Sequence, residues 1–185
     1  MNYRDKYHFD ICKTVATASK CLSRKIGAII VRDKSIISTG YNGPPRGVCQ
    51  CDQRWDLDLK DLKLPEDMTR HRGKCPRQVL GYASGQGLHL CNAGHAERNA
   101  LINAAREGVS TKGCIMYMDC PTPCVPCLVE IINAGIVEVV CASLTIYEER
   151  SSLTHLLLDQ GKLKVRTYEG EGIEFESGTY EKALN

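Results

Sequence analysis

The sequence predicts an α/β domain in which helices cover both faces of a central sheet. Short apolar runs rich in β-branched residues alternate with amphipathic stretches along the chain, as strands and helices do in turn. From Gly113 onward these runs form strand–helix–strand units, whose right-handed crossovers place helices on both sides of the sheet. At 185 residues and 43% hydrophobic content, the chain suits one domain with a sizeable core.

The N-terminal part predicts a helix followed by a hairpin. Apolar residues recur at helical spacing over 5–22, which predicts an amphipathic packing helix. The β-branched run 26–31, the polar turn 32–34 and the run 35–41 predict two adjacent antiparallel strands. The Pro-Pro pair that follows ends the second strand, because proline cannot continue a ladder of hydrogen bonds.

The remaining helices and strands alternate. The predicted helices are 96–107, 124–134 and 148–160, and the predicted strands are 113–118, 136–141 and 163–167. A glycine follows each of these helices and is typical of a helix C-terminus. The predicted order is therefore α-β-β-α-β-α-β-α-β within residues 1–168, and the charged, glycine-containing segment 169–185 is predicted to be a tail.

Residues 44–94 predict an irregular insertion in this domain. Proline and glycine recur throughout it, and only 53–64 has the pattern of a short helix. Loops of this length in a compact domain are usually functional or tied down.

Two short motifs predict a catalytic zinc site. His95-Ala96-Glu97 and Pro123-Cys124-Val125-Pro126-Cys127 supply one imidazole and two thiols, ligands that zinc prefers, and leave a fourth position open. Together they match the H-x-E and P-C-x-x-C signature of zinc-dependent nucleobase deaminases. In such a site an activated water attacks C4 of cytosine. Glu97 moves the water's proton to ring N3 and helps protonate the departing ammonia, without binding the metal.

Simpler interpretations account for less of the pattern. A lone Cys-x-x-Cys is also typical of a redox pair or of half a structural zinc finger, and a lone histidine is commonly an ordinary packed or surface residue. Neither alternative explains Glu97 at its position.

Composition limits the partners and the compartment. The net charge of +2 with interspersed signs gives no electrostatic reason to expect binding to duplex nucleic acid or a membrane surface. No apolar run approaches the ~20 residues of a membrane span, and the first residues lack a signal-peptide h-region. We therefore expect a cytoplasmic protein. There, eleven cysteines are more typical of metal binding than of disulfides.

A second group of cysteines predicts a structural zinc that ties the long insertion to the domain. Its candidate ligands are Cys21, Cys51, Cys75 and Cys91, with Cys49 as an alternative to Cys51 and His89 as a substitute. The spacing is irregular, and buried cysteines also occur simply as small hydrophobic residues.

Three segments together resemble the deoxycytidylate (dCMP) deaminase family. They are Gly40-Tyr41-Asn42-Gly43, His95-Ala96-Glu97-Arg98-Asn99-Ala100 and Pro123-Cys124-Val125-Pro126-Cys127, within a resemblance that covers residues 8–168. The resemblance implies the cytidine-deaminase-like fold, a three-layer α/β/α sandwich with a five-stranded mixed sheet. It also implies conversion of dCMP to dUMP, which feeds thymidylate synthesis. Members are typically homohexamers, some activated by dCTP and inhibited by dTTP. Some carry a second zinc at positions that Cys21 and Cys51 match.

The resemblance also suggests substrate contacts. Asn42 is the principal one, because its amide can donate and accept hydrogen bonds to a sugar or phosphate, although Asn-Gly is equally a common turn dipeptide. The candidate substrate contacts are Asn42, Ala96, Arg24, Lys25 and Arg46. The three cations are also compatible with solvated surface charge, and the Gly81–Gly87 run is a weak candidate cradle for a nucleotide phosphate.

The sequence departs from the family pattern at two places. The 52–90 loop is longer than in compact members, and Asp119-Cys120-Pro121-Thr122 replaces the usual lead into Pro-Cys. Two alternatives stay open. One is another deaminase of the same fold, acting on cytidine, a modified cytosine nucleotide or tRNA adenosine. The other is a non-catalytic zinc module.

Overall fold

A mixed five-stranded sheet forms the centre of the molecule. The structure is a computed structural model that describes residues 2–51, 53, 73–83, 85–146 and 151–173. The described strands are β1 (Gly27–Arg32), β2 (Ser35–Tyr41), β3 (Ile115–Met118), β4 (Glu138–Cys141) and β5 (Lys164–Thr167). Their order is β2-β1-β3-β4-β5, with β1 antiparallel to β2 and β3, and β3, β4 and β5 parallel. The predicted sheet is confirmed.

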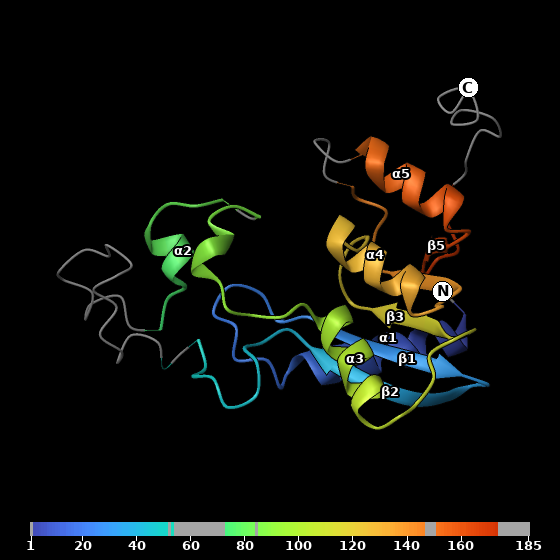
Figure 1. Cartoon of the computed structure of the whole chain (residues 1–185), viewed down its shortest axis with the longest axis horizontal. Helices are drawn as coiled ribbons and strands as arrows, with labels where there is room; N and C mark the ends of the chain where they lie inside the picture. The colour runs from blue at the N-terminus through green and yellow to red at the C-terminus, as the bar shows by residue number, and fades with distance from the viewer. Residues whose placement is uncertain (1, 52, 54–72, 84, 147–150, 174–185) are drawn as a thin grey trace.

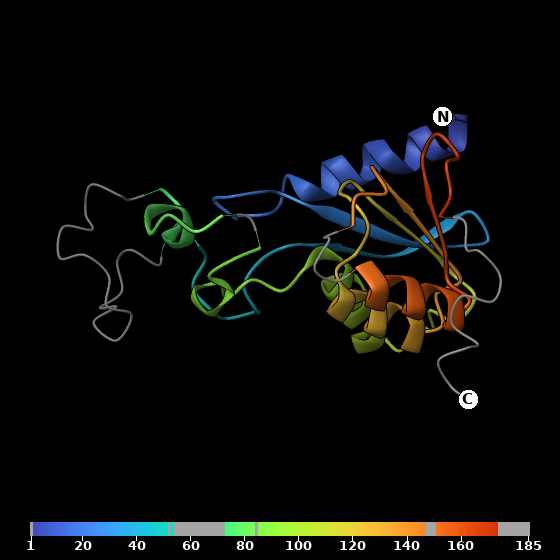
Figure 2. The same ribbon diagram turned by 90° about the horizontal axis from the view of Figure 1, so that it is seen from above.

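Helices cover both faces of this sheet. Figure 2 shows α1 (Tyr3–Ala16) on one face, and α3 (Ala96–Arg106), α4 (Val125–Asn133) and α5 (Ser151–Gln160) on the other. The insertion adds the short helix α2 (Pro76–Val79) and the 3-10 helix η4 (Leu88–Leu90), which extend to one side of the sandwich (Figure 1). The three-layer α/β/α prediction is therefore confirmed. No helix within the described residues combines the length and apolar character needed to cross a bilayer.

The strands are buried on both faces, which explains why their sequences are continuously apolar. Ile30 packs with α3 and α4 residues such as Ala100 and Leu128, whereas its neighbour Ile29 packs with Cys12 of α1. Gly40 of β2 lets α3 approach closely, because a Cβ there would lie 2.2 Å from the backbone nitrogen of Ala100. This contact fixes the start of α3 against the sheet.

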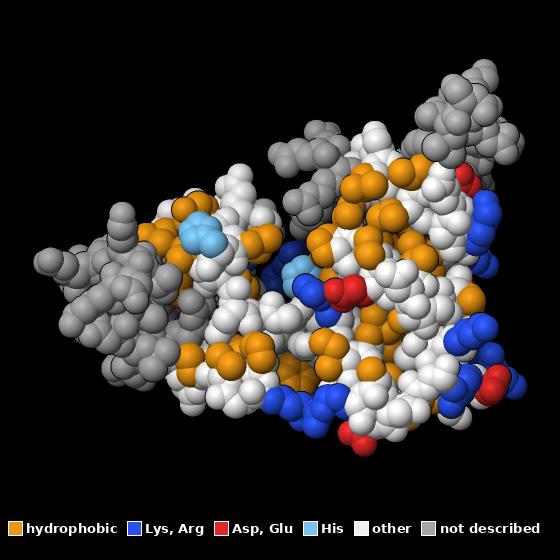
Figure 3. Space-filling view, viewed as in Figure 1, with side chains coloured by type: hydrophobic (Ala, Val, Ile, Leu, Met, Phe, Trp, Pro, Cys, Tyr) orange, Lys and Arg blue, Asp and Glu red, His pale blue; other side chains and the backbone are white. Residues whose placement is uncertain are grey.

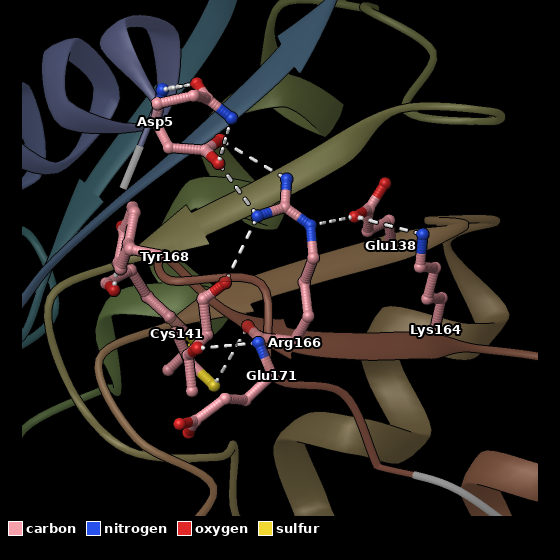
Figure 4. A network of polar contacts seen from close by, with 10 residues as sticks. Asp5, Glu138, Cys141, Lys164, Arg166, Tyr168 and Glu171 are labelled. Atoms are coloured by element: carbon pink, nitrogen blue, oxygen red, sulfur yellow. Dashed lines mark hydrogen bonds and ion pairs between the residues drawn. The ribbon is translucent and has the colours of Figure 1, made fainter.

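An ion-pair network joins α1 to the far edge of the sheet (Figure 4). The Arg166 guanidinium donates to Asp5 at 2.9 and 3.2 Å and to Glu138 at 2.6 Å. All three side chains are largely buried, and these hydrogen bonds raise the pKa of Arg166 although burial, the largest influence, lowers it. The network holds the first turn of α1 against β4 and β5.

The structure differs from the predicted elements in three places. One is the insertion, where α2 and η4 form although only 53–64 was predicted to be helical. The first helix ends at Ala16 instead of residue 22, because Ser19 Oγ donates to the Asn42 carbonyl at 2.7 Å and accepts from the Cys21 amide at 3.1 Å. The predicted tail does not start at residue 169. The chain turns back after β5, Gly172 pairs with Arg166, and Ile173 packs against the core. The predicted helix 53–64 lies almost wholly outside the described residues.

Candidate metal centre

Two helix N-termini converge to form the site. His95 is the N-cap residue of α3 and Cys124 is the N-cap residue of α4, and neither side chain makes a capping hydrogen bond. Cys127 follows in the first turn of α4 and is fully buried. Because the N-terminal ends of helices favour negative charge, this arrangement favours thiolates at the two cysteines.

The predicted ligands lie together. His95 Nδ1 is 3.5 Å from Cys124 Sγ and 3.3 Å from Cys127 Sγ. One donor atom from each residue lies within 4.8 Å of the other two. A nitrogen and two sulfurs at these separations suit a zinc ion, which binds such donors at about 2.0–2.3 Å. The site is open on the side of His95, which is exposed.

Electrostatics favour an anionic sulfur in this group. Hydrogen bonds with Cys127 and His95 lower the pKa of Cys124 to about 4, although burial opposes this shift. The hydrogen bond with Cys124 raises the pKa of His95. The hydrogen bond between Cys127 and Cys124, together with burial, raises the pKa of Cys127. The three donor atoms share protons and negative charge among themselves. A bound metal cation would take the place of those protons.

Glu97 lies in the first turn of α3, beside the three donors. Its side chain is buried, and burial raises the pKa of its carboxyl group. Contacts with His95 and Cys127 oppose that rise. A carboxyl group with a raised pKa beside a metal position can both accept and return a proton near neutral pH.

The Tyr41–Gly43 turn borders the site. Gly43 and Gly94 exchange backbone hydrogen bonds of 3.1 and 2.8 Å, directly before His95. Asn99 reinforces the contact, because its amide nitrogen donates to the carbonyl of Tyr41 at 2.8 Å. Asn99 lies within the His95–Ala100 motif, but this contact could not be predicted from the motif alone, because Tyr41 is distant in the chain.

The predicted substrate contacts divide into two groups. Arg46 lies away from the site, because it donates to Asn103, which is about 12 Å along α3 from His95. Ala96 is buried and belongs to the core cluster, so its side chain faces the core. Asn42 precedes Gly43, which pairs with Gly94 directly before His95, and its side chain contacts the backbone of Arg24 and Ile26.

The charge of Arg24 acts on Cys120, which the Glu97 carboxylate also reaches. Burial and the Glu97 and Asp119 carboxylates raise the pKa of Cys120, and the positive charge of Arg24 opposes that rise. Figure 3 shows a histidine in a hollow with Lys and Arg side chains beside and behind it.

The structure does not gather the cysteines of the predicted second zinc. Within the described residues, the His95 group is the one set of three or more such donors that lies close enough to hold a metal. Cys51 contacts the side chain of Asn92 at 3.9 Å, and Cys75 borders a small pocket with Ser23. The second zinc therefore stays a prediction. None of the described cysteines is in a disulfide.

In the Gly81–Gly87 run, backbone carbonyl groups point toward the positively charged side chain of Arg77. Arg77 donates to the carbonyls of Ala83 and Gln86 at 3.2 and 2.5 Å. A phosphate cradle needs backbone N–H groups, so the described part of this run gives that interpretation no support.

Comparison with known proteins identifies the family. The family described as the cytidine and deoxycytidylate deaminase zinc-binding region matches residues 2–143, which include the three candidate ligands and Glu97. The chain belongs to this deaminase family. Its membership supports zinc as the metal for the His95, Cys124 and Cys127 group.

Relatives named deoxycytidylate deaminase resemble much of the chain. The protein from Schizosaccharomyces pombe is 36% identical over 136 residues, which cover 74% of this chain but 36% of the relative. The protein from Enterobacteria phage T2 is 36% identical over 141 residues, covering 70% of this chain and 74% of the relative. The chain thus spans about a third of the yeast relative and most of the phage relative.

A solved structure shares the fold. The dCMP deaminase of cyanophage S-TIM5, determined in complex with dCMP and dUMP, matches with a TM-score of 0.61. The match covers 90% of this chain and 98% of that chain at 23% identity.

Proposed function

We propose that this chain hydrolyses dCMP to dUMP and ammonia at a zinc centre formed by His95, Cys124 and Cys127. The observation that carries the proposal is the convergence of these three donor atoms, within 4.8 Å of one another, beside the buried carboxyl group of Glu97. A purely structural metal site has no use for a buried acid–base group at that place. We choose dCMP over other cytosine compounds because these relatives are named deoxycytidylate deaminase.

Zinc and Glu97 have different roles in the proposed reaction. Zinc, when bound, supplies Lewis-acid chemistry that brings the pKa of water near ~7. Glu97 holds the proton that leaves the attacking water and delivers it to N3 of the cytosine ring. It then takes the remaining proton from the hydroxyl group on C4 and gives it to the departing amino group, so that water and cytosine become uracil and ammonia. Burial, which raises the pKa of Glu97, suits the carboxyl group to this exchange.

The 5′-phosphate of dCMP needs a positive partner. Arg24, whose charge reaches Cys120 near Glu97, is the cation we propose for it, and Lys25 is its immediate neighbour. Arg46 is not part of this proposal, because its guanidinium is engaged with Asn103 on the second half of α3.

A substrate panel tests the proposal. Protein of measured zinc content is assayed for ammonia release from dCMP, deoxycytidine, cytidine and cytosine. We expect the highest kcat/KM for dCMP. Equal or higher values for a phosphate-free compound would move the assignment to another deaminase of the same fold. No ammonia from any of them would contradict the proposal.

The finer properties suggested by the family resemblance are tested in the same preparation. We propose a homo-oligomer, expected to be a hexamer, that is activated by dCTP and inhibited by dTTP. Light scattering and assays with each nucleotide check these points. We also propose a cytoplasmic location, because the thiol ligands need a reducing compartment.

A further inference from the structure

We propose that Asn99 is a positioning residue that holds the turn after β2 in place against the metal centre. This turn, Tyr41–Gly43, carries Asn42, the principal predicted substrate contact, and it pairs with the residue directly before His95. The inference rests on the proposed function and deepens it, because it assigns the residue that aligns the bound pyrimidine with the metal.

The Asn99 side chain joins the two chain segments that meet at the site. Its Nδ2 donates to the Tyr41 carbonyl at 2.8 Å and, in a longer contact, to the Gly94 carbonyl at 3.4 Å. Gly94 and Gly43 exchange backbone hydrogen bonds of 3.1 and 2.8 Å, and these two bonds form an isolated bridge. One amide group therefore holds both sides of the bridge that links the turn to the start of α3.

Close packing adds to these hydrogen bonds. A Cβ at Gly94 would lie 2.8 Å from Oδ1 of Asn99, so the amide group fills the space beside this glycine. Asn99 is itself fixed at the start of α3, because its backbone amide donates to the carbonyl of His95 at 3.0 Å. The candidate metal ligand and the turn are therefore both tied to the same residue.

Asn103 makes the same kind of bond one turn further along α3. Its Nδ2 donates to the Thr39 carbonyl at 2.8 Å, and Thr39 lies two residues before Tyr41 on the edge strand β2. Both asparagine side chains are half-buried. The Asn99 bond lies at the turn beside the metal centre, whereas the Asn103 bond lies within the strand. The two positions therefore separate a role in positioning from a role in packing.

The test compares Asn99→Ala with the matched control Asn103→Ala in zinc-loaded protein. Each variant loses an amide donor with a 2.8 Å bond to β2, so we expect similar midpoints of urea unfolding. On dCMP we expect Asn99→Ala to lower kcat by about tenfold or more and to keep KM within about threefold, because misalignment of the pyrimidine and the metal costs most in the transition state. For Asn103→Ala, we expect both constants to stay within about twofold of the wild-type values.

Amide hydrogen exchange gives a readout that does not depend on activity. The amides of Gly43 and Gly94 donate to each other's carbonyls, so their exchange rates report how often the bridge opens. We expect both to exchange about tenfold faster in Asn99→Ala, with or without zinc, and at the wild-type rate in Asn103→Ala. Asn99→Asp is a second variant, which keeps the side chain's shape but has no N–H to donate, and it should show the same changes in exchange and kcat.

Three results would overturn the inference. The first is a rise in KM without a fall in kcat in Asn99→Ala, which would indicate that Asn99 binds the substrate directly. The second is an equal fall in kcat in Asn103→Ala, which would indicate a role in packing. The third is wild-type exchange of the Gly43 and Gly94 amides in Asn99→Ala.

Failure of the proposed function gives a different result. A wild-type protein that deaminates another cytosine compound in place of dCMP would correct the substrate alone, and the same variants would then be compared on that compound. Ammonia release from no cytosine compound would overturn the proposed function and this inference together.

Discussion

Arg98 and Glu130 form a two-pronged ion pair between the two helices that carry the candidate metal ligands. Arg98 Nε lies 2.9 Å from Glu130 Oε2, and its Nη2 lies 2.8 Å from Oε1. Arg98 follows His95 by three residues and Glu130 follows Cys127 by three, so each partner lies one turn beyond a ligand. The pair thus ties α3 to α4 next to the metal centre.

Breaking this ion pair should affect zinc retention more than the stability of the fold. Both side chains are partly exposed, so we expect Arg98→Ala to lower the free energy of unfolding by at most ~1 kcal/mol. We also expect faster loss of zinc to a chelator, because the two ligand-bearing helices are less firmly joined. Urea unfolding and chelator kinetics measure these effects. The control is Lys6→Ala, which breaks an exposed ion pair within α1 and should leave zinc release unchanged.

Replacing Glu97 by glutamine should abolish turnover and spare the metal. General acid–base catalysis contributes about 10²- to 10⁴-fold, so we expect kcat on dCMP to fall by at least that range. Zinc content should stay at the wild-type value, since the carboxyl group is not among the three donors. Glu107→Gln, an exposed change at the C-terminal end of α3, is the matched control. Wild-type turnover in Glu97→Gln would refute the proposed proton transfer.

Removing the Cys127 thiol should cost one zinc per chain. Cys127 is fully buried and 3.3 Å from His95, so Cys127→Ser leaves the metal with two strong donors. We expect metal analysis to find one equivalent less than in the wild-type protein, together with loss of turnover. The same analysis tests the predicted second zinc. A wild-type content near two that falls to one in Cys75→Ser would establish it, and a content near one would remove it.

Acid should destabilise the protein through His8. This residue is 1% exposed, and its Nδ1 has no hydrogen-bond partner within the described part of the chain. Burial lowers the pKa of His8, which the nearby Asp5 opposes, so the folded state keeps the ring neutral at a pH where the unfolded state is already protonated. His8 therefore contributes stability above its unfolded pKa of ~6.5, and this is lost as the pH falls through the folded value.

The His8→Phe variant isolates this contribution. Phenylalanine keeps a ring against Tyr117, whose ring centre lies 4.3 Å from that of His8, and it cannot take up a proton. We expect the free energy of unfolding between pH 7 and 5 to fall less steeply in the variant than in the wild-type protein. Parallel urea titrations across this range check the difference, and equal slopes would show that His8 carries none of the acid sensitivity.

Local sequence was enough to predict most elements and the three candidate metal donors that the structure brings together. The β-branched runs, the glycines after helices and the His95 and Cys124 motifs act over a few residues, and the structure places them as expected. The end of the first helix could not be predicted in this way. It depends on the bond of Ser19 to Asn42, twenty-three residues away in the chain.

The substrate contacts show the same limit. Arg24, Lys25 and Arg46 look alike in the sequence, as cations near the ends of the hairpin. The structure separates them. The Arg46 guanidinium donates a hydrogen bond to Asn103, whereas the Arg24 carbonyl accepts one from Asn42. The loop cysteines are similar, since their irregular spacing does not determine which thiols can approach one another.

By itself, the sequence determined the order of strands and helices, the sheet they form and the three donors with their glutamate. Each of these follows from periodicity or from a motif of fixed spacing. Only the tertiary structure decided which polar side chains face the site and which form hydrogen bonds inside the protein. The reason is physical: a side chain such as that of Asn42 pairs with whatever backbone groups the fold brings beside it, and those groups are distant in the chain.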